Sequence, residues 1–141
     1  MIAKPIHLIV YASRSLIPPA YAGREIDGIV AQSVDLNRRD AITGALLYTE
    51  DQRFAQALEG DVAMVAATMD RIKNDPRHHQ IVMLHDGGVA RRHFSGWSLA
   101  YQGNAPSVDQ TIRAAEYDAS RSSTRALSDL LGIMTQLVSH G

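Results

Sequence analysis

The chain has 141 residues, of which 45% are hydrophobic and 21% are charged, and its formal net charge is −1. This length suits one domain with a buried core, and the balanced charge gives no reason to expect nucleic acid or an anionic membrane as the main partner. Because the chain contains no cysteine, disulfides, thiolate catalysis and cysteine-ligated metal centres are excluded, and a cytoplasmic location is favoured.

Strand and helix patterns alternate in the first half of the chain. Residues 6–12 are rich in apolar and β-branched types and predict a first strand, too short to span a membrane. Apolar residues then recur at helical spacing over 23–39, and the inner face of this predicted helix ends in polar side chains that include Asn37. Two further strands at 42–49 and 53–60 are separated by a short turn, which predicts a hairpin.

The second half begins with a capped helix. Asp61 is a suitable N-cap, and the helix should end before Pro76 because a residue that precedes proline is pushed out of the helical region. Its predicted apolar stripe consists of Val62, Val65, Met69 and Ile72. Residues 81–85 predict a fourth strand, residues 86–96 a turn-rich connection, and residues 97–102 a fifth strand.

The order βαββαββ predicts an α+β, ferredoxin-like fold. Such a fold has a mixed sheet, here of five strands, with two helices on one face. The sequence breaks after this unit, so we expect one domain at residues 1–103 and a helical extension at residues 104–141.

Two helices are predicted in the extension, at residues 107–118 and 122–139, with Ser122 or Ser123 as the cap of the second. A wide apolar stripe runs through the second helix between residues 127 and 138. The two helices either cover the open face of the sheet or face a partner or a second copy of the chain, and the pattern leaves both open.

An uncharged amide lies on the core side of the third strand. Side chains alternate along a strand, so Phe54, Gln56 and Leu58 point the same way. Removing an amide from water without partners costs about 2–7 kcal/mol, so polar groups must meet Gln56. Tyr11 and Asn37 are the candidates. Each has an ordinary structural explanation when taken singly, but three polar side chains in apolar surroundings indicate a lined pocket.

Five strings occur in the sequence in a fixed order: VYASRS, NRRDAITGALLY, FAQALEG, IKNDPRHH and FSGWSL. Together they resemble the successive motifs of BLUF domains, which are blue-light sensors that use flavin. The resemblance covers about residues 6–103. It implies a photoreceptor rather than an enzyme, with FAD bound non-covalently and FMN or riboflavin as possible substitutes. It also implies an output through a homo-oligomer or a separate protein partner.

The resemblance implies roles for individual residues. Tyr11 matches the tyrosine that gives an electron and then a proton to the excited flavin, and Gln56 matches the glutamine whose rearranged hydrogen bonds produce a reversible red-shifted state. Trp97 matches the tryptophan beside them. The expected contacts to the flavin are Ile29, Asn37, Phe54, Arg77, His78 and Leu99. Leu99 departs from the methionine of many members and offers no sulfur acceptor to the glutamine.

Two other functions compete with the sensor. An acylphosphatase-like hydrolase would use Arg14 to hold phosphate and Asn37 to position water, although no glycine-rich loop follows the first strand. In a small-ligand-binding or interaction domain, other protein groups would merely satisfy the hydrogen bonds of the Gln56 amide.

Other features of the sequence favour ordinary structural roles. Arg91–Arg92 is expected to be a solvated pair and Gly87–Gly88 a turn. No metal site is expected, because the histidines at 78, 79, 85 and 93 lack tight ligand spacing.

Overall fold

The computed structural model describes residues 5–121 and 125–140. The strands are β1 (Ile6–Ser15), β2 (Thr43–Thr49), β3 (Arg53–Gly60), β4 (His78–Val89) and β5 (Trp97–Gly103). The helices are α1 (Ala22–Arg39), α2 (Val62–Lys73), α3 (Pro106–Ala119) and α4 (Arg125–His140), with a short 3-10 turn η1 (Pro19–Tyr21) before α1.

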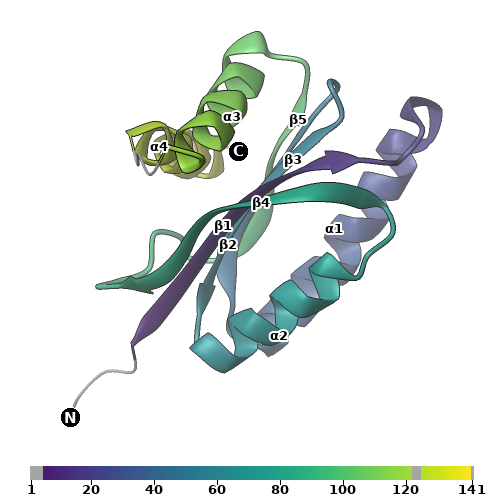
Figure 1. The fold of residues 1–141 in the computed structure, drawn as a ribbon. Helices are drawn as coiled ribbons and strands as arrows, with labels where there is room; N and C mark the ends of the chain where they lie inside the picture. The colour runs from purple at the N-terminus through teal and green to yellow at the C-terminus, as the bar shows by residue number, and fades with distance from the viewer. Residues whose placement is uncertain (1–4, 122–124, 141) are drawn as a thin grey trace.

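The strands form one five-stranded sheet in the order β4-β1-β3-β2-β5. The pairs β1–β3, β1–β4 and β2–β3 are antiparallel, whereas β2–β5 is parallel, so the sheet is mixed. Helices α1 and α2 lie on one face and α3 and α4 on the other (Figure 1). The predicted α+β fold, with a five-stranded mixed sheet and two additional C-terminal helices, is therefore confirmed.

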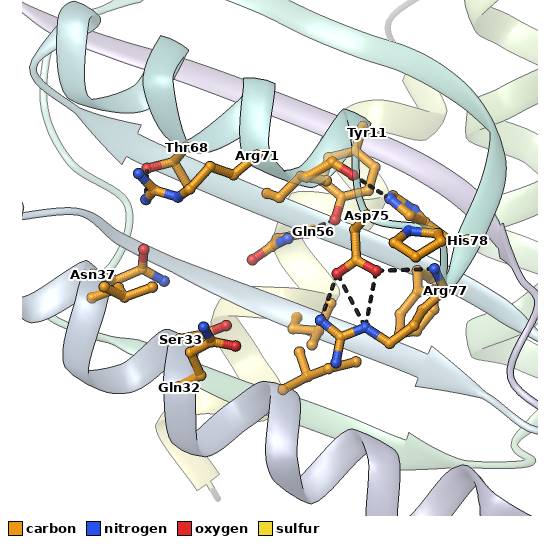
Figure 2. A pocket seen from close by; sticks show the side chains of 16 residues that line it. Tyr11, Gln32, Ser33, Asn37, Gln56, Thr68, Arg71, Asp75, Arg77 and His78 are labelled. Carbon is orange, nitrogen blue, oxygen red and sulfur yellow. Dashed lines mark hydrogen bonds and ion pairs between the residues drawn. The ribbon is translucent and has the colours of Figure 1, made fainter.

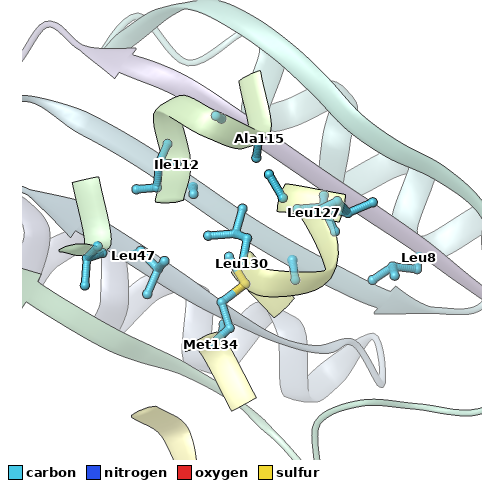
Figure 3. Close-up of a cluster of buried hydrophobic side chains, with 14 of the residues drawn as sticks. Leu8, Leu47, Ile112, Ala115, Leu127, Leu130 and Met134 are labelled. Carbon is cyan, nitrogen blue, oxygen red and sulfur yellow. The ribbon is translucent and has the colours of Figure 1, made fainter. Parts of the chain in front are cut away.

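Two cores are separated by the sheet, as strand alternation requires. On β1, Leu8 and Val10 belong to the core under α3 and α4, whereas Ile9 and Tyr11 belong to the core under α1 and α2. Figure 3 shows the first of these cores, in which α4 places Leu130 against the sheet. Full burial of such a leucine stabilises the fold by about 1.5–3 kcal/mol.

The apolar stripe of α4 is thus used within the chain. Leu127, Leu130 and Met134 are buried in the core shared with the sheet. Ionic contacts add to this attachment, because the nearly buried Arg53 of β3 contacts Asp109 at 3.3 Å and Glu116 at 3.2 Å, both on α3. A homo-oligomer stays a prediction, and this stripe no longer supports it.

Several element boundaries differ from the predicted ones. The first strand continues to Ser15, and β4 runs from His78 to Val89 instead of 81–85. Gly87 and Gly88 pair with Leu8 and His7 of β1, so the predicted turn at this position is wrong. The edge strand continues through both glycines because β1 supplies their hydrogen-bonding partners.

Helix α2 confirms its predicted limits. Asp61 accepts a hydrogen bond from Ala63 N at 3.0 Å, and the helix ends before Pro76. Val62 is 56% exposed, so its placement in the apolar stripe is wrong. The predicted caps Ser122 and Ser123 lie outside the described residues.

The pair Arg91–Arg92 is also different from the expectation. Arg92 is half-buried and donates to Thr43 Oγ1 at 2.9 Å and to the Glu59 carbonyl at 3.1 Å. This arginine therefore ties the segment between β4 and β5 to the sheet.

Gly44 allows β2 to approach β3 closely. A Cβ atom at this position would lie 1.9 Å from the Ala57 carbonyl oxygen. The Gly44 amide also donates to the Gly96 carbonyl at 3.0 Å, directly before Trp97. The missing side chain therefore helps to position the start of β5.

Candidate functional site

A cavity of about 470 Å³ lies between the sheet and helices α1 and α2 (Figure 2). This volume falls within the range of small-molecule sites, which is about 300–1,000 Å³. Its apolar walls include Ile29, Leu46, Phe54 and Ile72, and its polar lining includes Tyr11, Asn37, Gln56, Arg71, Arg77 and His78. The cavity therefore suits a ligand with an apolar body and several polar atoms.

Tyr11, Gln56 and Trp97 are joined by hydrogen bonds. Tyr11 and Gln56 are directly paired on β1 and β3, and Gln56 Nε2 donates to the Tyr11 hydroxyl at 2.6 Å. The Trp97 indole donates from Nε1 to Gln56 Oε1 at 3.0 Å. Because an indole N–H can only donate, the amide oxygen must face Trp97 and the amide nitrogen must face Tyr11. Trp97 thereby determines the orientation of the carboxamide.

The Tyr11 phenol is held in its neutral form. Burial raises the pKa of Tyr11 well above its ordinary value, the hydrogen bond from Gln56 opposes this change, and the nearby charge of Asp75 adds to it. The hydroxyl accepts from Gln56 and keeps its own proton available for donation.

Asn37 lies near the end of α1 and lines the cavity. Its side chain is only 3% exposed, and its carboxamide has no hydrogen-bonding partner among the described residues. A helix-terminal role does not explain it, because α1 continues to Arg39 and the left-handed residue that follows is Ala41, with φ 55°. The Asn37 carboxamide reaches the cavity and is therefore available to hydrogen-bond a polar atom of a ligand (Figure 2).

Asp75 holds Arg77 at one end of the cavity. The guanidinium donates from Nε to Asp75 Oδ1 at 2.9 Å, and this interaction lowers the pKa of Asp75. His78 is held by two groups: its Nε2 donates to the Ile72 carbonyl at 2.6 Å and its Nδ1 bonds to Ser13 Oγ at 2.7 Å. Both side chains are therefore fixed in place by the protein itself.

Most of the predicted site residues meet in this cavity. The residues that line it are Tyr11, Ile29, Asn37, Phe54, Gln56, Arg77 and His78. Trp97 reaches the site through Gln56. Leu99 packs in the same core but is not among the residues that line the cavity, so the contact expected from it stays a prediction.

Other lining residues were missed by the sequence analysis. They are Gln32, Ser33, Leu36, Leu46, Thr68, Arg71, Ile72, Asp75 and Pro76. The signal for those on the helices is spacing: Thr68, Arg71 and Ile72 are three and four residues apart and share one face of α2. The same rule relates Ser33 to Asn37 on α1.

The described chain gives no sign of a metal centre or a membrane span. No group of three or more His, Asp or Glu side chains could hold a metal ion within residues 5–121 and 125–140. Likewise, none of the helices in the described part of the chain is both long and apolar enough to cross a membrane.

A cavity with apolar walls, a phenol and a carboxamide has the features of a binding site for a small molecule with an apolar body and a few polar atoms. The sequence model of one protein family, described as sensors of blue-light using FAD, matches residues 6–100. The chain therefore belongs to the BLUF family, whose members are flavin-binding blue-light sensors. The resemblance expected from the sequence is confirmed.

Solved structures of BLUF proteins share the fold. The chain is similar to BlsA in its photo-activated state, with 22% identity, a TM-score of 0.75, and coverage of 92% of this chain and 94% of that one. It is also similar to BlrB, a BLUF protein in its dark state, with 23% identity, a TM-score of 0.64, and coverage of 99% and 98%.

A longer protein also matches. A bacterial light-regulated adenylyl cyclase is 27% identical with a TM-score of 0.64, and the match covers 93% of this chain and 39% of the cyclase. No curated protein sequence matches the chain.

Proposed function

We propose that Tyr11 and Gln56 are the photoactive pair of a blue-light sensor that holds FAD non-covalently in the cavity. The observation that carries this proposal is the Gln56 amide, which bridges Tyr11 and Trp97 beside the cavity. When bound, a flavin supplies a ring that blue light converts from a weak into a strong one-electron oxidant.

Tyr11 is the donor in this proposal. Its buried neutral phenol would give an electron and then its hydroxyl proton to a bound flavin, and both would return to Tyr11 when the cycle closes. No external reductant is consumed, and no covalent bond to the protein forms, which agrees with a chain that has no cysteine.

Gln56 stores the change. While Tyr11 lacks its electron and proton, the Gln56 carboxamide changes its hydrogen bonds by rotation or by tautomerisation. In the rotated form its oxygen faces Tyr11. The Trp97 indole then faces an amino group that cannot accept from it. The lost hydrogen bond costs about 0.5–1.5 kcal/mol, which favours thermal return to the dark arrangement.

The polar lining supports the binding part of the proposal. Asn37 would hydrogen-bond the flavin ring, and Ile29 and Phe54 would pack against its apolar surface. A second hollow of about 270 Å³ shares Pro76 and Arg77 with the first. This hollow gives room for the longer part of a dinucleotide, although Asp75 pairs with Arg77 and Glu25 also lines the hollow. The family description names FAD, so we favour FAD over riboflavin.

We propose that the light signal passes to a separate protein or to a second copy of this chain by way of the sheet face covered by α3 and α4. Support comes from β3, which carries residues that face both sides of the sheet. Gln56 faces the cavity, whereas Arg53, three residues earlier, binds Asp109 and Glu116 of α3.

The hydrolase alternative does not fit the geometry. Arg14 pairs with Arg53 on β3, and paired residues share a face. Arg53 contacts α3, whereas Asn37 lines the cavity on the opposite side of the sheet. The two groups that would hold phosphate and position water therefore do not converge.

Difference spectra before and after blue illumination test the proposal. The purified protein should be yellow and should show a reversible red shift of its flavin absorption. Tyr11→Phe and Gln56→Leu should each bind flavin and lose the red shift. Tyr48→Phe is the matched control, because Tyr48 is equally buried on the same face but does not line the cavity.

Two results would contradict the proposal. A normal photocycle in Tyr11→Phe or Gln56→Leu would remove these residues from the mechanism. A colourless protein with no affinity for added FAD would remove the flavin itself.

A further inference from the structure

Glu59 is a fully buried carboxylate that the photochemistry does not use. Its exposure is 0%, and it lies on β3 three residues after Gln56. An odd separation along a strand places two side chains on opposite faces, so Glu59 points away from the cavity. A buried charge in this position requires strong partners.

Most partners of the Glu59 carboxylate belong to the β4–β5 segment, residues 90–96. Its Oε1 accepts from the backbone amides of Phe94 at 2.8 Å and His93 at 2.9 Å, and its Oε2 accepts from His93 N at 2.8 Å. Thr43 of β2 donates to Oε1 at 2.9 Å. Two successive backbone N–H groups thus converge on one carboxylate, an arrangement in which a charged acceptor is stronger than a neutral one.

The β4–β5 segment leads directly to the site. Trp97 follows Phe94 by three residues, and its indole binds the Gln56 amide oxygen. Residues 56–59 and 94–97 are therefore two four-residue segments joined at both ends, by Trp97 with Gln56 at one end and by Phe94 with Glu59 at the other. Any displacement of the second segment moves the indole relative to the amide.

The segment also connects the two sides of the sheet. Phe94 is buried in the core under α3 and α4, whereas Trp97 is buried in the core under α1 and α2. Glu59 holds the backbone at the point where the chain passes from one core to the other.

We propose that Glu59 is a positioning residue of the photoactive site. Its carboxylate fixes the β4–β5 segment so that the Trp97 indole meets Gln56 Oε1, which sets the orientation of the Gln56 amide in the dark. The consequence for the photocycle rests on the proposed function of Gln56, but the effect on Trp97 itself does not.

The single tryptophan of the chain makes this proposal directly measurable, because all indole emission comes from Trp97. In Glu59→Ala with flavin bound, we expect dark-state emission at longer wavelength than in the unsubstituted protein and loss of protection from acrylamide quenching. The rate of thermal return after illumination should change by about 2–12-fold, the range that corresponds to loss of one hydrogen bond. Glu59→Gln keeps one acceptor oxygen and should give intermediate values of emission, quenching and rate.

Thr49→Val is the matched control. Thr49 is another buried polar side chain on the face of α3 and α4, and it binds Asp109 instead of the β4–β5 segment. This variant should lower the melting temperature without changing the emission of Trp97 or the return rate. The comparison separates positioning of Trp97 from a general loss of stability.

The outcomes are distinguishable. The proposal is overturned if folded Glu59→Ala has the same emission, quenching and return rate as the unsubstituted protein. If Glu59→Ala does not fold, the same result in Glu59→Gln overturns it. Absence of a red shift in the unsubstituted protein would contradict the proposed function, while the dark emission would still decide the role of Glu59.

Discussion

The amide nitrogen of Gln56 lies 2.6 Å from the phenol oxygen of Tyr11, across directly paired positions of β3 and β1. The contact thus depends on the register of two adjacent strands and not on a loop. Trp97 then determines which end of the amide faces the phenol, because its indole can only donate. The site therefore has one hydrogen-bond arrangement in this structure, and each part of it can be tested.

Trp97 emission should change on blue illumination and recover in the dark together with the flavin spectrum. The indole loses its acceptor when Gln56 reorients, so its environment changes even if the backbone does not move. Emission of the single tryptophan, recorded before and after illumination, measures this. Gln56→Leu should show no light-dependent change in emission. If the full change persisted in that variant, the emission of Trp97 would not depend on the Gln56 amide.

Tyr11 should make the stability of the fold decrease at alkaline pH. Because burial raises the pKa of Tyr11, the folded state keeps a proton that the unfolded chain loses above about pH 10. Its stabilising effect is complete below that pH and decreases as the pH rises. Relative to Tyr11→Phe, the free energy of unfolding should fall by about 1.4 kcal/mol by about pH 11. Urea titrations of both proteins check this, and parallel pH curves would contradict it.

Asn37→Ala should weaken flavin binding by about 2–12-fold, the range expected for loss of one neutral hydrogen bond. Since the Asn37 amide has no partner among the described residues, the flavin-free protein should not lose stability. Flavin titration and melting of the flavin-free protein measure the two effects. Asn74→Ala, at the exposed end of α2, is the control and should leave the affinity unchanged. An Asn37→Ala protein with full affinity and a lowered melting temperature would show a purely structural role.

Gly44→Ala should destabilise the fold by about 1–3 kcal/mol or more, because the added Cβ would collide with the Ala57 carbonyl oxygen and force the backbone to shift. Gly28→Ala is its counterpart in α1, where nothing lies within 4 Å of the added atom. That substitution should stabilise the fold by about 0.5–1 kcal/mol. Denaturant titrations compare the two, and equal effects would show that β2 can move away from β3 at low cost.

Removal of residues 104–141 should leave a chain that self-associates. It would uncover the face that carries Leu8, Val10 and Leu47 and remove the partners of Arg53 on α3. An uncovered apolar face of this kind promotes aggregation. Sedimentation or light scattering of the shortened chain measures the effect. A monodisperse fragment with the same melting temperature as the full chain would show that residues 1–103 fold independently of the extension.

Strand alternation predicted much of this site. It placed Tyr11 and Gln56 on core-facing positions, but it could not give their pairing, since the two residues are 45 positions apart and meet only through the β1–β3 register. The family resemblance, and not any spacing rule, brought Arg77 and His78 into the site. Asp75 is only two residues before Arg77, so their ion pair is a local contact, whereas Ser13 meets His78 only through the pairing of β1 with β4.

The other face of the sheet was harder to predict. Glu59 and Arg53 are charged residues that alternation places opposite Gln56, where the sequence allowed either solvent or a helical cover. Only the packing of α3 and α4 shows that both charges are buried and paired. Gly87–Gly88 has turn composition, yet pairing with β1 keeps it extended, so a tertiary contact overrides the local preference.

The separation of Gln56 from Glu59 has a consequence for recombining this domain with its relatives. A one-residue insertion or deletion between them would turn every later side chain of the strand to the other face of the sheet. The Glu59 carboxylate would then point toward the flavin cavity. The hairpin turn at residues 50–52 lies outside this interval. Chimeric sensors should therefore tolerate grafted turns of different length. When two sequences are joined between residues 56 and 59, however, the separation of these two positions must stay odd.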